Sequence, residues 1–168
     1  YLAGDELMTY RGQLASGQMR DHVVAAIQHK PPPASPNPMS DDEAAAARAF
    51  AEEHARRLVP EDVRARIATP PVTVIGIGAI KYYGDRPAHE LGAQCSRRLL
   101  EERIESLVDK SDETIGGDYA STQVSDRLLL LGYMAALEVD TVLLADVDLT
   151  DGVMVEPAFW QRSAPANQ

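Results

Sequence analysis

The sequence is poor in cysteine, lysine and aromatic residues, and it lacks a long apolar run. Cys95 is the single cysteine, so an intrachain disulfide is excluded, and no cluster of thiols and histidines has the spacing of a zinc site. The absence of disulfides is typical of a reducing compartment, and we therefore expect a cytoplasmic protein. No apolar run approaches the ~20 residues that span a bilayer, and the opening residues lack the basic and apolar regions of a secretory signal. We expect no membrane partner.

Positive charge is also scarce. The formal net charge is −10, and lysine occurs only at positions 30, 81 and 110. Because an acidic chain is repelled by nucleic acid, we expect no nucleic-acid partner. The same repulsion opposes any polyanionic ligand, which would need a local cluster of arginines, backbone N–H groups or a divalent cation to bind.

The length and composition predict one domain over residues 1–168. The chain is 45% apolar, and at this size a domain buries roughly 68–70% of the surface of its unfolded chain. Five prolines in residues 31–39 disfavour helix and inner strand, so we expect a surface loop there. Residues 162–168 are expected to form a flexible tail. The first residue is Tyr1 rather than methionine, and we expect the chain to be part of a longer protein.

Periodicity and capping signals alternate between strand and helix. Ser40 and Glu43 form a capping box, and Pro60 suits the first position of a short helix. The β-branched segment 72–75 and the segment 141–145 are typical of buried strands. Further expected elements are a strand or bent pair of strands over 5–15, a helix over 18–28 capped by Ser16, and helices over 41–58, 97–108 and 122–137. This order predicts an α/β fold with helices flanking a mixed sheet.

The most informative motif is Gly76-Ile77-Gly78-Ala79, which directly follows the strand expected over 72–75. Glycines at the end of a strand leave backbone N–H groups open to a phosphate. The motif is not a complete dinucleotide-binding fingerprint, because the third glycine is missing. It is not a P-loop either, because no Gly-Lys-Ser/Thr sequence follows. A simple tight turn is the alternative.

This arrangement resembles the exopolyphosphatase/guanosine pentaphosphate phosphohydrolase (Ppx/GppA) family. Val74–Ile80 matches a strand that runs into a Gly-x-Gly-Gly-Thr loop, and Ala145–Gly152 matches a Ser-Asp-x-Gly-Leu-Arg-Glu-Gly turn. Leu14–Gly17 is similar to an upstream strand with its Leu-Gly turn. The resemblance covers about residues 5–155 and implies the second half of an actin-like, ribonuclease H-like fold.

The resemblance implies a hydrolase of phosphoanhydride bonds acting on polyphosphate or a guanosine polyphosphate, with Mg²⁺ or a similar cation. Gly76, Gly78 and Ala79 would bind phosphate. The expected edge of the cleft consists of Ser16, Gly17, Asp146, Asp151 and Gly152. The metal ligands are not specified, and no catalytic residue is expected in this chain, since the catalytic glutamate of the family comes from sequence before the first strand. We therefore expect the isolated chain to be inactive, with the remaining half of the fold or a second copy as its partner.

Several departures from the family pattern keep two alternatives open. Ala79-Ile80 replaces Gly-Thr, while Asp148 and Thr150 replace a glycine and an arginine, so a hydroxyl and a bidentate anion donor are absent. One alternative is a phosphate- or nucleotide-sensing module whose catalytic site has decayed. The other is a protein-interaction domain that docks through the apolar helix segment 128–137.

The remaining polar residues favour structural roles. Acids at 41–43 suit a helix N-terminus, and Glu101, Glu102 and Glu105 are expected on a solvated helix face. His54 is expected on an apolar helix stripe as a structural residue, and Cys95 as a partly buried thiol on a helix.

Overall fold

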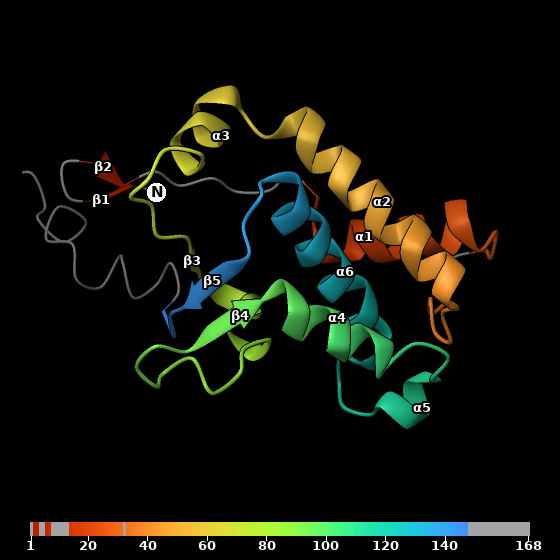
Figure 1. Ribbon diagram of the computed structural model, residues 1–168. Helices are drawn as coiled ribbons and strands as arrows, with labels where there is room; N and C mark the ends of the chain where they lie inside the picture. The colour runs from red at the N-terminus through yellow and green to blue at the C-terminus, as the bar shows by residue number, and fades with distance from the viewer. Residues whose placement is uncertain (1, 4–5, 8–13, 32, 148–168) are drawn as a thin grey trace, which may run out of the picture.

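Residues 2–3, 6–7, 14–31 and 33–147 are described by the computed structural model (Figure 1). In these residues the fold consists of six α helices, one π-helical segment, one short 3-10 helix and two small sheets. The helical segments are α1 (Ser16–His22), η1 (Val23–Ile27), α2 (Asp41–Leu58), α3 (Glu61–Ile67), η2 (Gly78–Tyr82), α4 (Arg97–Glu105), α5 (Asp112–Ile115) and α6 (Ala120–Ala136). The strands are β1 (Leu2–Ala3), β2 (Glu6–Leu7), β3 (Ile75–Gly76), β4 (Gln94–Ser96) and β5 (Thr141–Leu144).

The sheet that positions the site has the strand order β3-β5-β4. β3 runs parallel to β5, with Ile75 opposite Leu143, and β4 runs antiparallel to it, with Cys95 opposite Val142. The expected mixed sheet flanked by helices is thus confirmed. β1 and β2 form a separate antiparallel pair.

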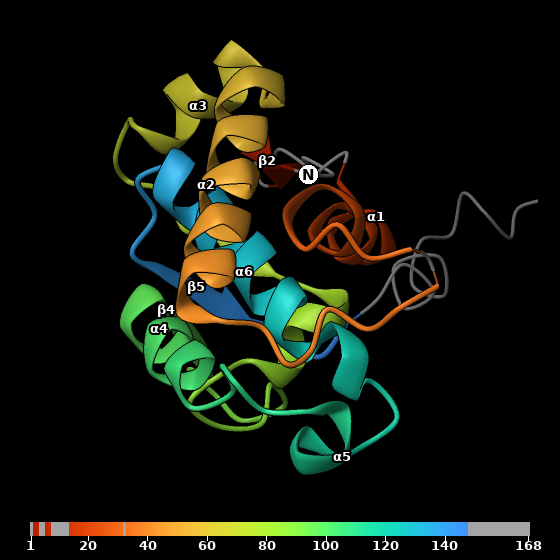
Figure 2. The ribbon, with the colours of Figure 1, turned by 90° about the vertical axis from the view of Figure 1, so that its right-hand side faces the viewer.

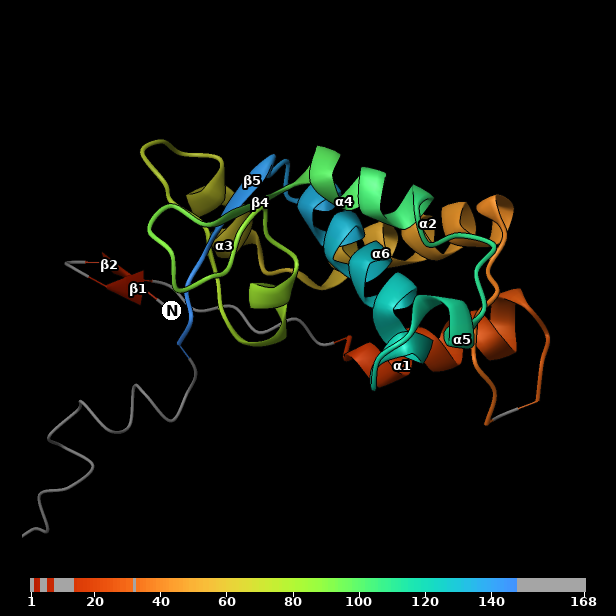
Figure 3. The same ribbon diagram turned by 90° about the horizontal axis from the view of Figure 1, so that it is seen from below.

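Helix α6 is the centre of the packing. It contacts α1, α2, α4 and α5, and α2 is its most extensive neighbour. Figures 2 and 3 show α1 and α4 on opposite sides of α6. The apolar side of α6 forms the core with residues from α1, η1, α2, α4 and β5: Met19, Val23, Ala47, Ala51, Leu100, Ile104, Val124, Leu128, Leu131, Met134, Val142 and Leu144. None of the helices in the described part of the chain is both long and apolar enough to cross a membrane.

Most of the predicted helices are present where the local signals lie. The Ser40 hydroxyl accepts a hydrogen bond from the Glu43 amide and the Glu43 carboxylate accepts one from the Ser40 amide, so the capping box that begins α2 is confirmed. Pro60 is the N-cap of α3 rather than its first residue. Ser16 is also not a cap, because α1 begins at Ser16 itself with Ala15 as the N-cap. A π-helical turn then continues the helix to Ile27.

The structure corrects the extent of one strand and the burial expected for three segments. Of the strand expected over 72–75, only Ile75 is a strand residue, because β3 pairs with β5 only through Ile75 and Gly76. The strands at 75–76 and 141–144 alternate between exposed and less exposed residues instead of being buried on both faces, since Ile75 is 53% exposed and Leu143 is 40% exposed. The buried stripe of α2 consists of four alanines, whereas Phe50 and His54 are only half-buried. The proline-rich loop is partly internal, because Pro36, Asn37 and Met39 are buried.

Two expected regions fall largely on residues that the structure does not describe. Most of the strand expected over 5–15 lies there. Of its described residues, Glu6 and Leu7 form strand β2, whereas Leu14 and Ala15 are not strand residues. The tail 162–168 and the residues Asp148, Thr150, Asp151 and Gly152 also lie outside the described residues.

Candidate functional site

The Gly-x-Gly motif lies at the edge of the sheet where two parallel strands end. β3 ends at Gly76, β5 ends at Leu144, and the amide of Ala145 donates a hydrogen bond to the Gly76 carbonyl at 3.1 Å. Ligands of open α/β sheets bind outside the carboxyl ends of such strands. The motif is therefore at a place in the fold that suits a ligand.

The two glycines of the motif are required for different reasons. A Cβ atom on Gly76 would lie 2.8 Å from an Ile80 side-chain carbon and 3.0 Å from one of Val142, so Gly76 permits close packing of the turn on the sheet. Gly78 has a φ of +75°, which glycine adopts without strain, and a Cβ at this position would meet no atom within 4 Å. Gly78 thus lies in open space, whereas Gly76 is packed against the side chains of Ile80 and Val142.

A short 3-10 helix begins at Gly78. The first amides of a helix have no acceptor inside it and carry partial positive charge. The amides of Gly78 and Ala79 belong to this first turn, since Ile77 is the N-cap of η2. Both residues are therefore placed to donate to an external acceptor.

Lys81 and Asp146 form an ion pair beside this turn. The Lys81 Nζ lies 2.6 Å from an Oδ1 oxygen of Asp146, and the side chains are 27% and 43% exposed. Asp146 was expected at the cleft edge, and the structure brings it to the Gly-x-Gly turn. Lys81 was not among the residues expected at the site. Two features of the sequence could have pointed to Lys81: lysine is rare in the chain, and Lys81 lies three residues after Gly78. Its pairing with Asp146 could not be predicted, because the two residues are 65 positions apart.

The other expected edge residues are elsewhere or not described. Ser16 and Gly17 lie in the first turn of α1, where the Ser16 hydroxyl donates a hydrogen bond to the Asp126 carboxylate of α6. This contact fixes α1 on α6. Asp151 and Gly152 are outside the described residues.

The residues that the structure describes do not by themselves fit a magnesium ion. Among them, no group of three or more histidine, cysteine, aspartate or glutamate side chains is arranged to hold a metal. Asp146 is the carboxylate that the structure brings to the turn, and its Oδ1 oxygen is already paired with the ammonium of Lys81. A magnesium site would need ligands beyond these residues.

Cys95 was expected as a partly buried thiol on a helix. It is fully buried, and it lies in strand β4 rather than on a helix. Burial raises the pKa of its thiol to about 11, which disfavours the reactive thiolate.

The apolar helix segment 128–137 was considered as a docking surface for another protein. Leu128, Leu131 and Met134 are each 2% exposed, so α6 is a core helix and not an exposed docking surface.

Comparison with known proteins supports the fold. The sequence matches no protein-family profile and no curated protein. The structure is similar to a crystal structure of the type II variant of the Aquifex aeolicus Ppx/GppA phosphatase, with a TM-score of 0.59 and 14% sequence identity. The match covers 84% of this chain and 46% of the phosphatase chain, so the chain spans about half the length of that protein. At this identity the similarity is one of fold: this chain folds like part of a Ppx/GppA phosphatase.

Proposed function

We propose that the chain is the phosphate-binding second half of a phosphoanhydride hydrolase of the Ppx/GppA kind. The observation that carries this proposal is the open Gly78 turn at the carboxyl ends of β3 and β5, in a chain whose fold is similar to that of such a phosphatase. The ligand would be the terminal phosphates of polyphosphate or of a guanosine polyphosphate.

The role of this chain in such a reaction is binding and orientation. Phosphoryl transfer to water depends on positioning the phosphate and on neutralising its charge. The amides of Gly78 and Ala79 would donate to phosphate oxygens, and the Lys81 ammonium would add positive charge near the same edge. The group that activates the attacking water would come from outside the described residues, so binding and hydrolysis are separable properties.

A matched pair of substitutions at Gly78 tests the binding. Asparagine and aspartate both tolerate the left-handed conformation, and the space around this position accommodates either side chain. Gly78→Asp adds a negative charge beside the bound phosphate, whereas Gly78→Asn adds nearly the same volume without charge. We expect tripolyphosphate to bind the Asp variant at least about tenfold more weakly than the Asn variant, which corresponds to about 1.4 kcal/mol.

The measurement is a titration of ¹⁵N-labelled protein with tripolyphosphate at constant ionic strength. Saturable shifts of the Gly76, Gly78 and Ala79 amides are expected. The proposal is wrong if these amides do not respond, or if the two variants bind with equal affinity. The isolated chain is expected to release no phosphate under the same conditions, and phosphate release by it would show that a catalytic group has been missed.

A sensing role is the second candidate, and the replacement of Gly-Thr by Ala79-Ile80 favours it. The two functions differ in the behaviour of a longer protein that contains this chain. Binding with phosphate release indicates the hydrolase, and binding without release indicates the sensor.

A further inference from the structure

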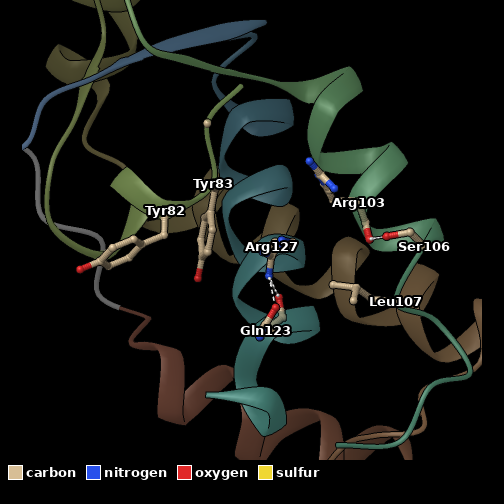
Figure 4. Close-up of a pocket in the computed structure, with 8 residues that line it drawn as sticks. Tyr82, Tyr83, Arg103, Ser106, Leu107, Gln123 and Arg127 are labelled. Atoms are coloured by element: carbon tan, nitrogen blue, oxygen red, sulfur yellow. Dashed lines mark hydrogen bonds between the residues drawn. The ribbon is translucent and has the colours of Figure 1, made fainter. Parts of the chain in front are cut away.

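A pocket of about 210 Å³ lies at the other end of η2, away from the Gly78 turn. It is bounded by the segment that leaves η2, by the C-terminal part of α4 and by α6 (Figure 4). The 3-10 helix rises about 2 Å per residue, so its two ends are roughly 10 Å apart. The residues that line the pocket include Tyr82, Tyr83, Arg103, Gln123 and Arg127.

Arg127 is held in this pocket with much of its hydrogen-bonding capacity unused. Its guanidinium carbon lies 4.6 Å from the centre of the Tyr83 ring, and its Nη1 atom donates to the Gln123 carbonyl at 2.8 Å. The Nε atom is buried and has no hydrogen-bond partner, and among the described residues Nη2 also has none. A guanidinium has five N–H donors, so three of those of Arg127 have no hydrogen-bond partner among the described residues.

Arg103 brings a second positive charge to the same pocket. It reaches from α4 toward α6, as Figure 4 shows, and its side chain is exposed. The proximity of the two like charges has a cost: burial lowers the pKa of Arg127 and repulsion by Arg103 adds to this shift, whereas Tyr83 and Asp126 partly oppose it. An anion between the two guanidinium groups would remove this repulsion.

No carboxylate in the described part of the chain forms an ion pair with either of these two arginines. Asp126 follows Gln123 and precedes Arg127 in α6, but its carboxylate instead accepts hydrogen bonds from the Ser16 hydroxyl and, at 3.4 Å, from the Tyr83 hydroxyl. The absence of an ion pair at two neighbouring arginines is unusual in a chain with a net charge of −10. Most of the other arginines that the structure describes pair with an acid: Arg20, Arg48, Arg56, Arg64, Arg86, Arg97 and Arg98.

We infer that this pocket is a binding site for a dianionic phosphate group, separate from the Gly78 turn and independent of the function proposed above. Two guanidinium groups match the charge of a phosphate dianion, and their N–H groups suit its oxygens. The volume is below the ~300 Å³ typical of sites for larger ligands, so the site takes the phosphate group itself. Tyr82, which is 75% exposed at the rim, could contact the remainder of a phosphate ester.

The test is a titration of the ¹⁵N-labelled chain with inorganic phosphate, with chloride keeping the ionic strength constant. Saturable shifts are expected at Tyr83, Gly84 and Gln123, whose side chains or backbone line the pocket. Arg103→Gln removes an exposed side chain and should leave the fold intact. It is expected to weaken phosphate binding about tenfold, as the loss of a charge-assisted hydrogen bond does.

Arg98→Gln is the matched control. It changes the net charge equally and lies on the same helix, but its side chain is 86% exposed and pairs with Glu102. We expect it to leave phosphate binding within about twofold of the parent. Equal affinities of the Arg103 and Arg98 variants, or the absence of saturable shifts at the pocket, would overturn the inference.

Two further arms identify the ligand and separate this site from the Gly78 turn. Acetate carries one charge, and binding of acetate as tight as that of phosphate would contradict a dianion site. Tighter binding of phenyl phosphate than of inorganic phosphate would support a phosphate ester as the ligand, and equal or weaker binding would support the free ion. Shifts confined to Gly78 and Ala79 would overturn this inference while supporting the proposed function.

Discussion

Gly132 of α6 lies directly against Ala51 of α2. A Cβ atom on Gly132 would be 2.6 Å from the Ala51 Cβ and 2.8 Å from the backbone nitrogen of Glu52. Neither atom can rotate away, because both belong to the helix backbone or its first side-chain atom. Together with the buried alanines of α2, this glycine allows the two helices to pack at close range.

Gly132→Ala is therefore expected to destabilise the protein. In a helix, alanine is more stable than glycine by about 1 kcal/mol, but overpacking costs ~1–3 kcal/mol. We expect a cost near the upper end of this range, because the added methyl group would contact backbone atoms. We expect a net loss of about 2 kcal/mol in the free energy of unfolding, measured by urea denaturation.

Gly17→Ala is the control for this substitution. Gly17 is also helical, but a Cβ at this position meets nothing within 4 Å. Its replacement should be neutral or stabilising by up to about 1 kcal/mol. A stabilised Gly132→Ala variant would show that the two helices can separate at little cost.

Asn37 anchors the proline-rich loop to the helical core. It is 8% exposed, and its side-chain amide donates to the Asp112 carboxylate at 2.9 Å and to the Ala120 carbonyl at 3.0 Å. Asn37→Ala removes both bonds and leaves a buried carbonyl without this donor, so we expect a loss of about 2 kcal/mol in unfolding free energy. Ser35→Ala removes two part-buried bonds, one donated to Asp112 and one accepted from the Asn37 backbone amide, but it keeps both bonds of the Asn37 side chain, and it should cost about 1 kcal/mol. Equal costs for the two variants would show that the loop is not anchored through Asn37.

His22 gives the stability a dependence on pH. Its ring lies flat on Phe50, with the ring centroids 3.5 Å apart, and burial lowers its pKa below the usual 6.5. The folded protein therefore favours neutral imidazole, and below about pH 6.5 the unfolded chain takes up a proton first. We expect the unfolding free energy to decrease as the pH falls from 7.5 to 5.5.

His22→Phe should weaken this dependence, because it keeps an aromatic ring against Phe50 and removes the titrating group. Some dependence should remain, since burial and the charge of Arg57 also lower the pKa of His54. His89→Gln removes an exposed imidazole and serves as the control. An unchanged pH profile for His22→Phe would exclude His22 as the source.

Cys95 should be unreactive in the folded protein. Its thiol is buried, and with a pKa of about 11 only roughly a thousandth of it is thiolate at pH 8. Alkylation by iodoacetamide should therefore proceed at the rate of unfolding and become fast in denaturant. In a Cys95→Ala background, Leu91→Cys places a thiol at a position that is 99% exposed, and this thiol should react at once. Rapid alkylation of native Cys95 would show that β4 opens readily.

The sequence by itself determined the elements whose signals lie within a few residues of one another. The capping box of Ser40 and Glu43 begins α2 as predicted, and α4 begins at position 97 as predicted. The strand predicted over 141–145 is present as β5, although it is not buried on both faces. The position of the Gly-x-Gly turn after a strand also followed from the sequence, because glycine at the end of a β-branched run has a local conformational meaning. Whether that turn binds phosphate is still a prediction.

Only the tertiary structure decided which strands and side chains meet. β3 is half-exposed because it lies at the edge of the sheet, and a strand's own residues do not specify its place in the strand order. The short strand β4 has no strong pattern of its own, and it forms by pairing with β5, which is more than 40 residues away in the chain. The Lys81–Asp146 pair and the meeting of Arg103 with Arg127 likewise join separate elements. Such contacts depend on how helices and strands pack around α6, and a local sequence pattern carries no information about distances between elements that are far apart in the chain.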